Sequence, residues 1–228
     1  LQIITDISKG NANWLDLGCG SGALAAAWVK NGPGGSYTGV DFSPELLEEA
    51  QSLLDETLAS TGVQARGMRN RQAAAFRFLQ ADLSNPAWVE PLRGECYDGI
   101  LAFAVLHHLP GAALRQRILR QVRDLMPVGG TFIHSVWQFQ LSPRLVARCL
   151  PWDTVGIDES NLEEGDTLLD WRHALPVQSE QVGLRYVHRF SREELEDLAR
   201  ASGFTVVHTF ESDGKEGRLG LYQQWQAV

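Results

Sequence analysis

The sequence predicts an α/β fold, with a mostly parallel sheet, helices on both faces and an antiparallel hairpin at the C-terminal end. A short apolar run at 14–17 passes through a glycine turn directly into a helical segment at 23–30. Strand-like and helical patches then alternate as far as residue 137, which is typical of parallel strands joined by right-handed crossovers. Two strand-like runs at 204–210 and 219–225 have only a glycine-containing loop between them, which favours a hairpin.

Local signals justify the remaining elements. Ser43 and Pro44 suit the N-cap and the first position of a helix that continues to Leu54. A helix at 111–125 carries apolar residues on one face, and Ser191 to Glu194 form a capping box that begins another helix. The other expected strands are 36–41, 76–80, 98–103 and 131–137, and residues 59–74 form a connector.

Composition narrows the class of protein. The net charge of −8 and the pI near 5.2 argue against a broadly basic nucleic-acid binder, but leave a local basic patch open. The cysteines at 19, 96 and 149 show no pairing or zinc spacing, which favours a reducing, cytoplasmic setting. No apolar run approaches the ~18 residues of a membrane span, so no membrane partner is expected. Because the chain starts at Leu1 and the glycine motif already begins at Trp14, we expect a further N-terminal segment.

The glycine motif is the first candidate ligand site. It reads Trp14-Leu15-Asp16-Leu17-Gly18-Cys19-Gly20-Ser21-Gly22. Glycine tolerates positive φ and lets a ligand approach the backbone, and the following helix adds the positive end of its dipole. The candidate contacts are Asp16, Gly18, Cys19, Gly20 and Gly22, and the alternative is a bare strand-to-helix turn. The spacing differs from the Gly-x-Gly-x-x-Gly of dinucleotide sites.

Three further signals follow strand ends, where open α/β sheets bind ligands. Asp41 stands where a carboxylate accepts hydrogen bonds from both hydroxyls of a ribose, and Phe42 can pack on adenine. The alternative is that Asp41 only begins the next helix. Ala81-Asp82-Leu83 follows the third strand, with a helix-capping Asp as the alternative. The stretch from Ala102 to Leu109 includes Ala104 and a His pair, with His107 expected in a pocket wall and His108 bonded to backbone. No third ligand accompanies the pair, so we expect no metal.

These motifs, in this order over residues 14–137, resemble the class I S-adenosylmethionine-dependent methyltransferases. The resemblance implies a Rossmann-like sheet and S-adenosyl-L-methionine as cofactor. It also implies a glycine loop around the amino-acid end of the cofactor, Asp82 on the adenine amino group, and a methyl-transfer channel beside 102–109. NAD is the alternative cofactor, since Asp41 suits its ribose equally well.

A narrower resemblance, to the tRNA wobble-uridine carboxymethyl methyltransferases, is carried by Val136-Trp137, Gly165-Asp166, 185–190 and Glu194-Leu195. It implies esterification of a carboxymethyl group, with Arg185, Tyr186 and His188 beside the substrate. The expected partners are a tRNA or small-molecule substrate and a small activating protein. Arginines at 115, 117, 120 and 123 can hold phosphates, or simply form a solvated helix face. The alternatives are a small-molecule methyltransferase and a non-catalytic cofactor-binding subunit.

We expect one methyltransferase domain over residues 1–228, with 138–190 as a substrate-side insertion or lid. The region from 137 interleaves aromatic, Arg and His side chains, which can bind a planar anion or simply pack on the core. The set is Trp137, Arg144, Arg148, Trp152, Trp171, Arg172, His173, Arg185, Tyr186, His188 and Arg189. Methyl transfer is a direct displacement that chiefly needs alignment. A carboxylate acceptor needs no base, whereas a phenol, amine or hydroxyl acceptor would make His107 or His188 the candidate base.

Overall fold

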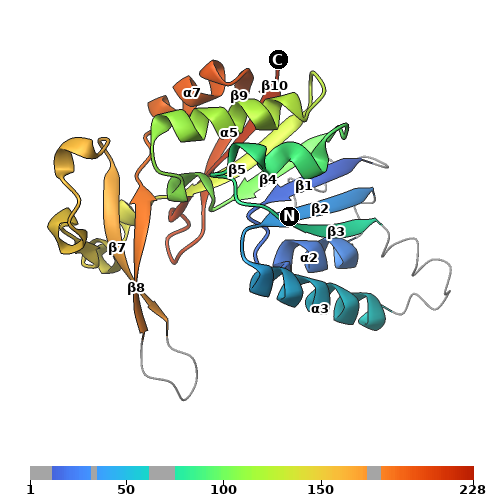
Figure 1. Cartoon of the computed structure of the whole chain (residues 1–228), viewed down its shortest axis with the longest axis horizontal. Coiled ribbons are helices and arrows are strands. Elements are labelled where there is room, and N and C mark those ends of the chain that lie inside the picture. Colours follow the sequence, from blue (N-terminus) through green and yellow to red (C-terminus); the bar gives the residue numbers. More distant parts are fainter. Residues whose placement is uncertain (1–11, 32–34, 62–74, 174–180) are drawn as a thin grey trace.

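The computed structural model describes residues 12–31, 35–61, 75–173 and 181–228, and its centre is a seven-stranded sheet of order β3-β2-β1-β4-β5-β10-β9 (Figure 1). Five strands pair in parallel, and β10 pairs antiparallel with both β5 and β9. The expected mostly parallel sheet with a C-terminal antiparallel hairpin is therefore confirmed. Its strands are β1 (Asn13–Leu17), β2 (Ser36–Asp41), β3 (Phe76–Gln80), β4 (Gly99–Phe103), β5 (Thr131–Trp137), β9 (Phe204–Ser212) and β10 (Gly220–Ala227).

Helices cover both faces of this sheet. On one face lie α2 (Ala23–Asn31) and α3 (Pro44–Ser60); on the other lie η1 (Pro86–Leu92), α5 (Ala112–Asp124) and α7 (Arg192–Ala201) (Figure 1). The predicted N-caps are present: the Leu46 N–H donates to Ser43 Oγ at 3.2 Å, and the Glu194 N–H donates to Ser191 Oγ at 3.0 Å. Each cap satisfies an N–H that the helix itself leaves without a partner.

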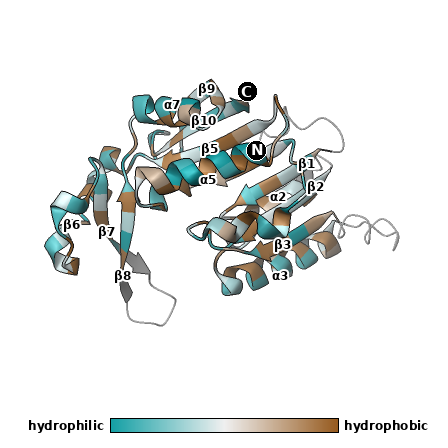
Figure 2. Ribbon diagram, turned by 45° about the horizontal axis from the view of Figure 1, so that its top comes forward, coloured by the Kyte–Doolittle hydropathy of each residue, from teal (hydrophilic) through white to brown (hydrophobic). Residues whose placement is uncertain are grey.

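Alternation along the strands divides the core into two layers. In β1, Leu15 and Leu17 pack with α5 and α7, whereas Trp14 packs with Trp28 of α2 on the opposite face. Figure 2 shows hydrophobic residues gathered on the strands and hydrophilic ones on the outer helix faces. No helix in the described part of the chain has the length and apolar character needed to cross a bilayer.

The insertion forms a second, three-stranded antiparallel sheet, which was not predicted from the sequence. Its strands are β6 (Cys149–Leu150), β7 (Asp166–His173) and β8 (Gln181–His188), in the order β6-β7-β8. Short turns precede β7, namely η3 (Phe139–Leu141), α6 (Pro143–Val146), η4 (Trp152–Val155) and η5 (Glu159–Asn161). A small core of Phe139, Leu169 and Val187 supports this sheet. The side chains of Trp171, Arg172 and His173 lie outside what the structure describes.

Candidate functional site

Residues at the carboxyl ends of four parallel strands, β1 to β4, line a cavity of about 500 Å³. Parallel strands present these ends at one edge, so residues far apart in the sequence meet there. Its volume lies within the ~300–1,000 Å³ typical of small-molecule sites. The predicted ligand residues in its wall are Gly18, Asp41, Phe42, Ala81, Asp82, Leu83 and Ala104. The cavity is also lined by residues not predicted as cofactor contacts, among them Val105, His108, Leu109, Pro110 and Leu114.

The glycines between β1 and α2 have different roles. Gly18, Gly20 and Gly22 all have positive φ, at 68°, 54° and 76°. A Cβ on Gly18 would lie 2.6 Å from Val105 Cγ2, and one on Gly22 would lie 2.8 Å from the Cβ of Ala50. A Cβ on Gly20 would meet no described atom within 4 Å. Packing therefore requires two of these glycines, whereas Gly20 leaves space for a ligand.

Asp41 holds this loop in place from the end of β2. It is 7% exposed, and its two oxygens accept the Gly20 N–H at 2.9 Å and the Ser43 N–H at 3.0 Å. Each carboxylate oxygen can accept a second hydrogen bond, so capacity remains for ligand hydroxyls. Phe42 beside it is 70% exposed at the cavity.

The ends of β3 and β4 add one hydrogen-bond acceptor, Asp82, and one residue with a positive φ, Ala104. Asp82 uses Oδ1 to accept the Ser84 N–H at 2.8 Å, which leaves Oδ2 available to a donor in the cavity. Ala104 has a φ of 57°, and its N–H donates to the carbonyl and the hydroxyl of Ser135 at 3.1 and 3.0 Å. A non-glycine residue in this conformation costs about 1–3 kcal/mol and is characteristic of functional sites.

Asp16 and Cys19 lie behind the loop rather than in the cavity wall. Asp16 is 3% exposed and accepts a hydrogen bond from the Tyr37 hydroxyl. Burial raises the pKa of Asp16 to about 7. Burial also raises the pKa of the Cys19 thiol, so this cysteine stays protonated at neutral pH.

The two histidines after β4 occupy different environments. They lie in one 3₁₀ turn, η2 (Leu106–His108), where successive side chains point about 120° apart. His107 is fully buried, and its Nδ1 accepts the Trp137 N–H at 3.3 Å. His107 Nε2 has no partner within the described residues. His108 takes the wall position that was expected for His107, and its Nδ1 lies 3.0 Å from the Tyr186 carbonyl oxygen. Burial lowers the pKa of both rings.

The four residues predicted as catalytic form two groups. The Arg185 guanidinium lies 5.8 Å from the ring centre of Trp137, the last residue of β5. The Trp137 ring in turn stacks on His107. The Tyr186 hydroxyl donates to Asp166 at 2.6 Å, and His188 contacts the same carboxylate oxygen at 2.6 Å. Catalytic roles for His107, Arg185, Tyr186 and His188 stay predictions.

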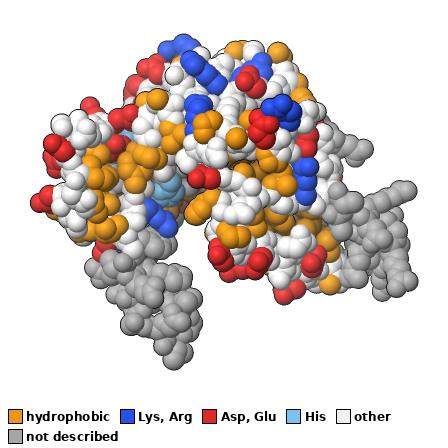
Figure 3. Space-filling view, in the orientation of Figure 1, with side chains coloured by type: hydrophobic (Ala, Val, Ile, Leu, Met, Phe, Trp, Pro, Cys, Tyr) orange, Lys and Arg blue, Asp and Glu red, His pale blue; other side chains and the backbone are white. Residues whose placement is uncertain are grey.

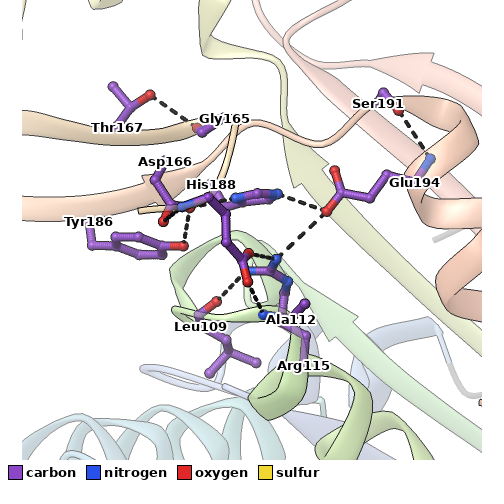
Figure 4. Close-up of polar contacts among 11 residues, drawn as sticks. Leu109, Ala112, Arg115, Gly165, Asp166, Thr167, Tyr186, His188, Ser191 and Glu194 are labelled. Carbon is purple, nitrogen blue, oxygen red and sulfur yellow. Dashed lines mark hydrogen bonds and ion pairs between the residues drawn. The ribbon is translucent and has the colours of Figure 1, made fainter. Parts of the chain in front are cut away.

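His188 belongs to a partly buried cluster that joins the insertion to α5 and α7 (Figure 4). We call Arg115, Glu163, Asp166, His188 and Glu194 the anchor cluster. Arg115 is 1% exposed, pairs with Glu163, and lies 3.7 Å from Glu194, whose other contact is His188 at 2.8 Å. Glu163, Asp166 and His188 offer ligand atoms within 4.8 Å of one another. Both nitrogens of His188 already contact carboxylates, and the Arg115 guanidinium supplies a positive charge that balances the acidic side chains. We therefore interpret the cluster as a structural anchor rather than a metal site.

Three of the four arginines on α5 contact other parts of the fold. Arg115 is buried, so neither a phosphate-binding patch nor a solvated face describes it correctly. Arg117 donates to the Ser84 carbonyl at 2.7 Å, and Arg123 donates to the Met126 carbonyl at 3.0 Å. Arg120 remains exposed.

Figure 3 shows the surface hollowed between the insertion and the main sheet, with histidine and hydrophobic side chains in the hollow.

The protein-family model and the curated proteins that match this sequence are all described as methyltransferases. Residues 2–209 match the family model described as "Methyltransferase domain". The chain is 28% identical over 121 residues to ribosomal RNA large subunit methyltransferase G of Pseudomonas fluorescens, covering 53% of this chain and 28% of that protein. It is 31% identical over 84 residues to trans-aconitate 2-methyltransferase of Escherichia coli, covering 36% of this chain and 33% of that protein. The chain thus spans a third or less of these curated relatives.

Solved structures share the fold. A SAM-dependent methyltransferase from Methanosarcina mazei superposes with a TM-score of 0.68 at 21% identity, covering 100% of this chain and 98% of that one. The 1,6-didemethyltoxoflavin-N1-methyltransferase of Burkholderia thailandensis, solved with bound 1,6-didemethyltoxoflavin and S-adenosylhomocysteine, superposes with a TM-score of 0.61 at 19% identity, covering 100% of this chain and 76% of that one.

Proposed function

The chain belongs to the methyltransferase domain family, and from that premise we propose that it transfers a methyl group from S-adenosylmethionine to a small molecule. One observation carries the proposal: residues at the ends of four strands, β1 to β4, converge on one cavity that also borders η2, the turn that contacts β8 of the insertion. This convergence supports a cofactor site in the main sheet and an acceptor site in the adjoining hollow.

The residues of the cavity fit this cofactor. Asp41 is suited to the ribose hydroxyls, Phe42 to one face of the adenine, and Oδ2 of Asp82 to the adenine amino group. Open space at Gly20 suits the amino-acid end. The bound cofactor supplies an electrophilic methyl group on a sulfonium, so the chain has to align the acceptor and exclude water.

The identity of the methyl acceptor is the more specific part of the proposal. Three of the four arginines expected to hold phosphates on α5 are occupied within the fold, which favours a small molecule over a tRNA. Of the two curated relatives, one acts by name on ribosomal RNA and the other on trans-aconitate. The wobble-uridine acceptor, implied by the narrower resemblance, remains the second candidate.

Calorimetric titration with S-adenosylhomocysteine, with NAD as control, tests the cofactor assignment. We expect binding of the former alone. Asp41→Asn should weaken it about tenfold or more, because hydrogen bonds to charged groups contribute about 1.5–3 kcal/mol each. Asp55→Asn, an exposed change on α3, is the matched control. Unchanged affinity in Asp41→Asn would refute the ribose contact.

Transfer of tritiated methyl groups then separates the acceptors. Small phenols, amines and acids are compared with total tRNA at equal concentrations of protein and S-adenosylmethionine. Incorporation into tRNA alone would replace the small-molecule proposal by the wobble-uridine candidate.

A further inference from the structure

His108 is placed at the boundary between the cavity and the insertion. His108 lines the same cavity as Asp41 and Asp82, whereas the neighbouring His107 is fully buried. His108 is half-buried and its ring contacts the edge of Trp137, with the two ring centres 5.7 Å apart. The ring is therefore fixed in orientation and still accessible from the cavity.

The hydrogen bond of His108 assigns its tautomer. A carbonyl oxygen only accepts, so the 3.0 Å contact with the Tyr186 carbonyl requires a proton on Nδ1. Burial lowers the pKa of the ring, and the Arg185 charge lowers it further, so the imidazole is neutral at neutral pH. In that tautomer the free lone pair is on Nε2. Within the described residues nothing donates to Nε2.

From this geometry we infer that His108 is the general base of the reaction, and that the acceptor loses a proton on methylation. The acceptor is then a hydroxyl, phenol or N–H compound. This inference rests on the proposed function and specifies the substrate class of the same site.

The step balances without a further reactant. The acceptor's X–H proton passes to Nε2 of His108 and leaves an imidazolium. The acceptor's lone pair forms the bond to the methyl carbon, and the electron pair of the broken carbon–sulfur bond returns to sulfur. S-adenosylhomocysteine and the methylated acceptor are the products, and the imidazolium then loses its proton to water.

A carboxylate acceptor fits this site less well. It is ionised at neutral pH and needs no base. Its oxygens would also face the lone pair of Nε2, and two acceptors without a proton between them repel. His107 does not substitute as the base, because its Nδ1 accepts from Trp137 and its buried ring does not reach the cavity.

Burial and neighbouring charges set the pH range in which His108 can act as a base. The titratable and charged groups around His108 are His107 in the same turn, Arg185 on β8, and Asp41 and Asp82, which line the same cavity. Arg115 on α5 donates to the carbonyl of the adjacent Leu109. Burial lowers the pKa of the His108 ring, the hydrogen bond to Tyr186 opposes this shift, and the Arg185 charge adds to it. We therefore expect the rate to rise with pH below about 6.5 and then level off.

Nuclear magnetic resonance of the ¹⁵N-labelled protein tests the tautomer without any acceptor. Long-range ¹H–¹⁵N spectra, with His108→Gln to assign the signals, should show a neutral ring protonated at Nδ1 at neutral pH, both free and with S-adenosylhomocysteine. A ring protonated at Nε2, or an imidazolium at neutral pH, would overturn the assignment.

Transfer of tritiated methyl groups tests the substrate class. Catechol and aniline are compared with benzoate, using wild type, His108→Gln and the control His208→Gln, which changes an exposed residue of β9. We expect transfer to catechol or aniline over benzoate, and a loss in kcat of about 10²–10⁴ in His108→Gln. KM, S-adenosylhomocysteine affinity and the control should change little.

Two results would contradict the inference: preference for benzoate, or a His108→Gln variant that keeps the wild-type kcat and pH profile. Loss of S-adenosylhomocysteine binding by the wild type is a different failure. It would remove the proposed function itself, and calorimetry detects it separately.

Discussion

Replacing Arg115 by Met should destabilise the protein and loosen the insertion. The guanidinium donates to the Leu109 carbonyl at 3.0 Å, pairs with Glu163 and lies 5.3 Å from the ring centre of Phe190. Methionine keeps most of the apolar stem but removes every one of these polar contacts. The side chain is 1% exposed, so water does not replace them at the same position.

The magnitude follows from what the substitution leaves behind. Removing one partner of a buried ion pair costs about 3–5 kcal/mol. The side chains of Glu163 and Glu194 are 36% and 37% exposed, so water partly solvates the two abandoned carboxylates. We therefore expect the lower end, about 3 kcal/mol, which corresponds to about 6–12 °C in Tm for a chain of this size.

Urea denaturation gives the free energy of unfolding for Arg115→Met, Glu163→Gln and the double variant. Glu163→Gln should cost less, about 1–2 kcal/mol, because Arg115 keeps Glu194 and the Leu109 carbonyl. The double-mutant cycle should give a coupling of about 1–3 kcal/mol. Arg120→Met, an exposed change on the same helix, is the control and should stay within about 0.5 kcal/mol. If Arg115→Met costs no more than this control, the anchor cluster does not stabilise the fold.

Three further predictions concern single residues. Burial disfavours the His188 imidazolium, but hydrogen bonds to Glu194 and Asp166 outweigh burial and raise the pKa of His188. The loss of unfolding free energy in His188→Gln, measured by urea titration, should therefore be largest below about pH 6.5 and should shrink as pH rises through the raised pKa. Gly22→Ala should cost about 1–3 kcal/mol more than Gly20→Ala, because both require positive φ but only the former meets Ala50; equal losses would contradict the packing argument. Because burial raises the pKa of Asp16 to about 7, the wild type should lose stability as pH rises to that value, whereas Asp16→Asn should not, so thermal melts should favour the variant more at pH ~8 than at pH ~5.

The main sheet could be predicted because its signals are local. The glycine turn, the caps at Ser43 and Ser191 and the alternation of strand and helix each depend on a few adjacent residues. The positions of Asp41 and Asp82 in one cavity follow from the rule that parallel strands end at the same edge. No long-range contact had to be known for any of these conclusions.

The insertion and the histidine assignment could not be predicted in the same way. β7 and β8 carry charged and polar residues on both faces, so their alternation does not show which face is buried. Their partners include Arg115 of α5, which pairs with Glu163 48 residues away just before β7. Adjacent histidines in a 3₁₀ turn must face different directions, but the sequence does not show which one faces the cavity. Packing of Trp137 against His107 decides it.

Anchoring of the insertion and orientation of His108 depend on the same residue of β8. The Tyr186 hydroxyl is held by Asp166 of the anchor cluster, while its carbonyl oxygen accepts the Nδ1 proton of His108. A β8 strand released by Arg115→Met should therefore weaken the bond that fixes the tautomer, and nuclear magnetic resonance should detect a mixture of Nδ1- and Nε2-protonated rings. The expected consequence for catalysis is a lower kcat with little change in S-adenosylhomocysteine affinity, because the cofactor residues lie on the main sheet. If His108 in Arg115→Met keeps a proton on Nδ1 alone while the protein loses stability, β8 is held against η2 by other contacts, and the two functions of Tyr186 are independent.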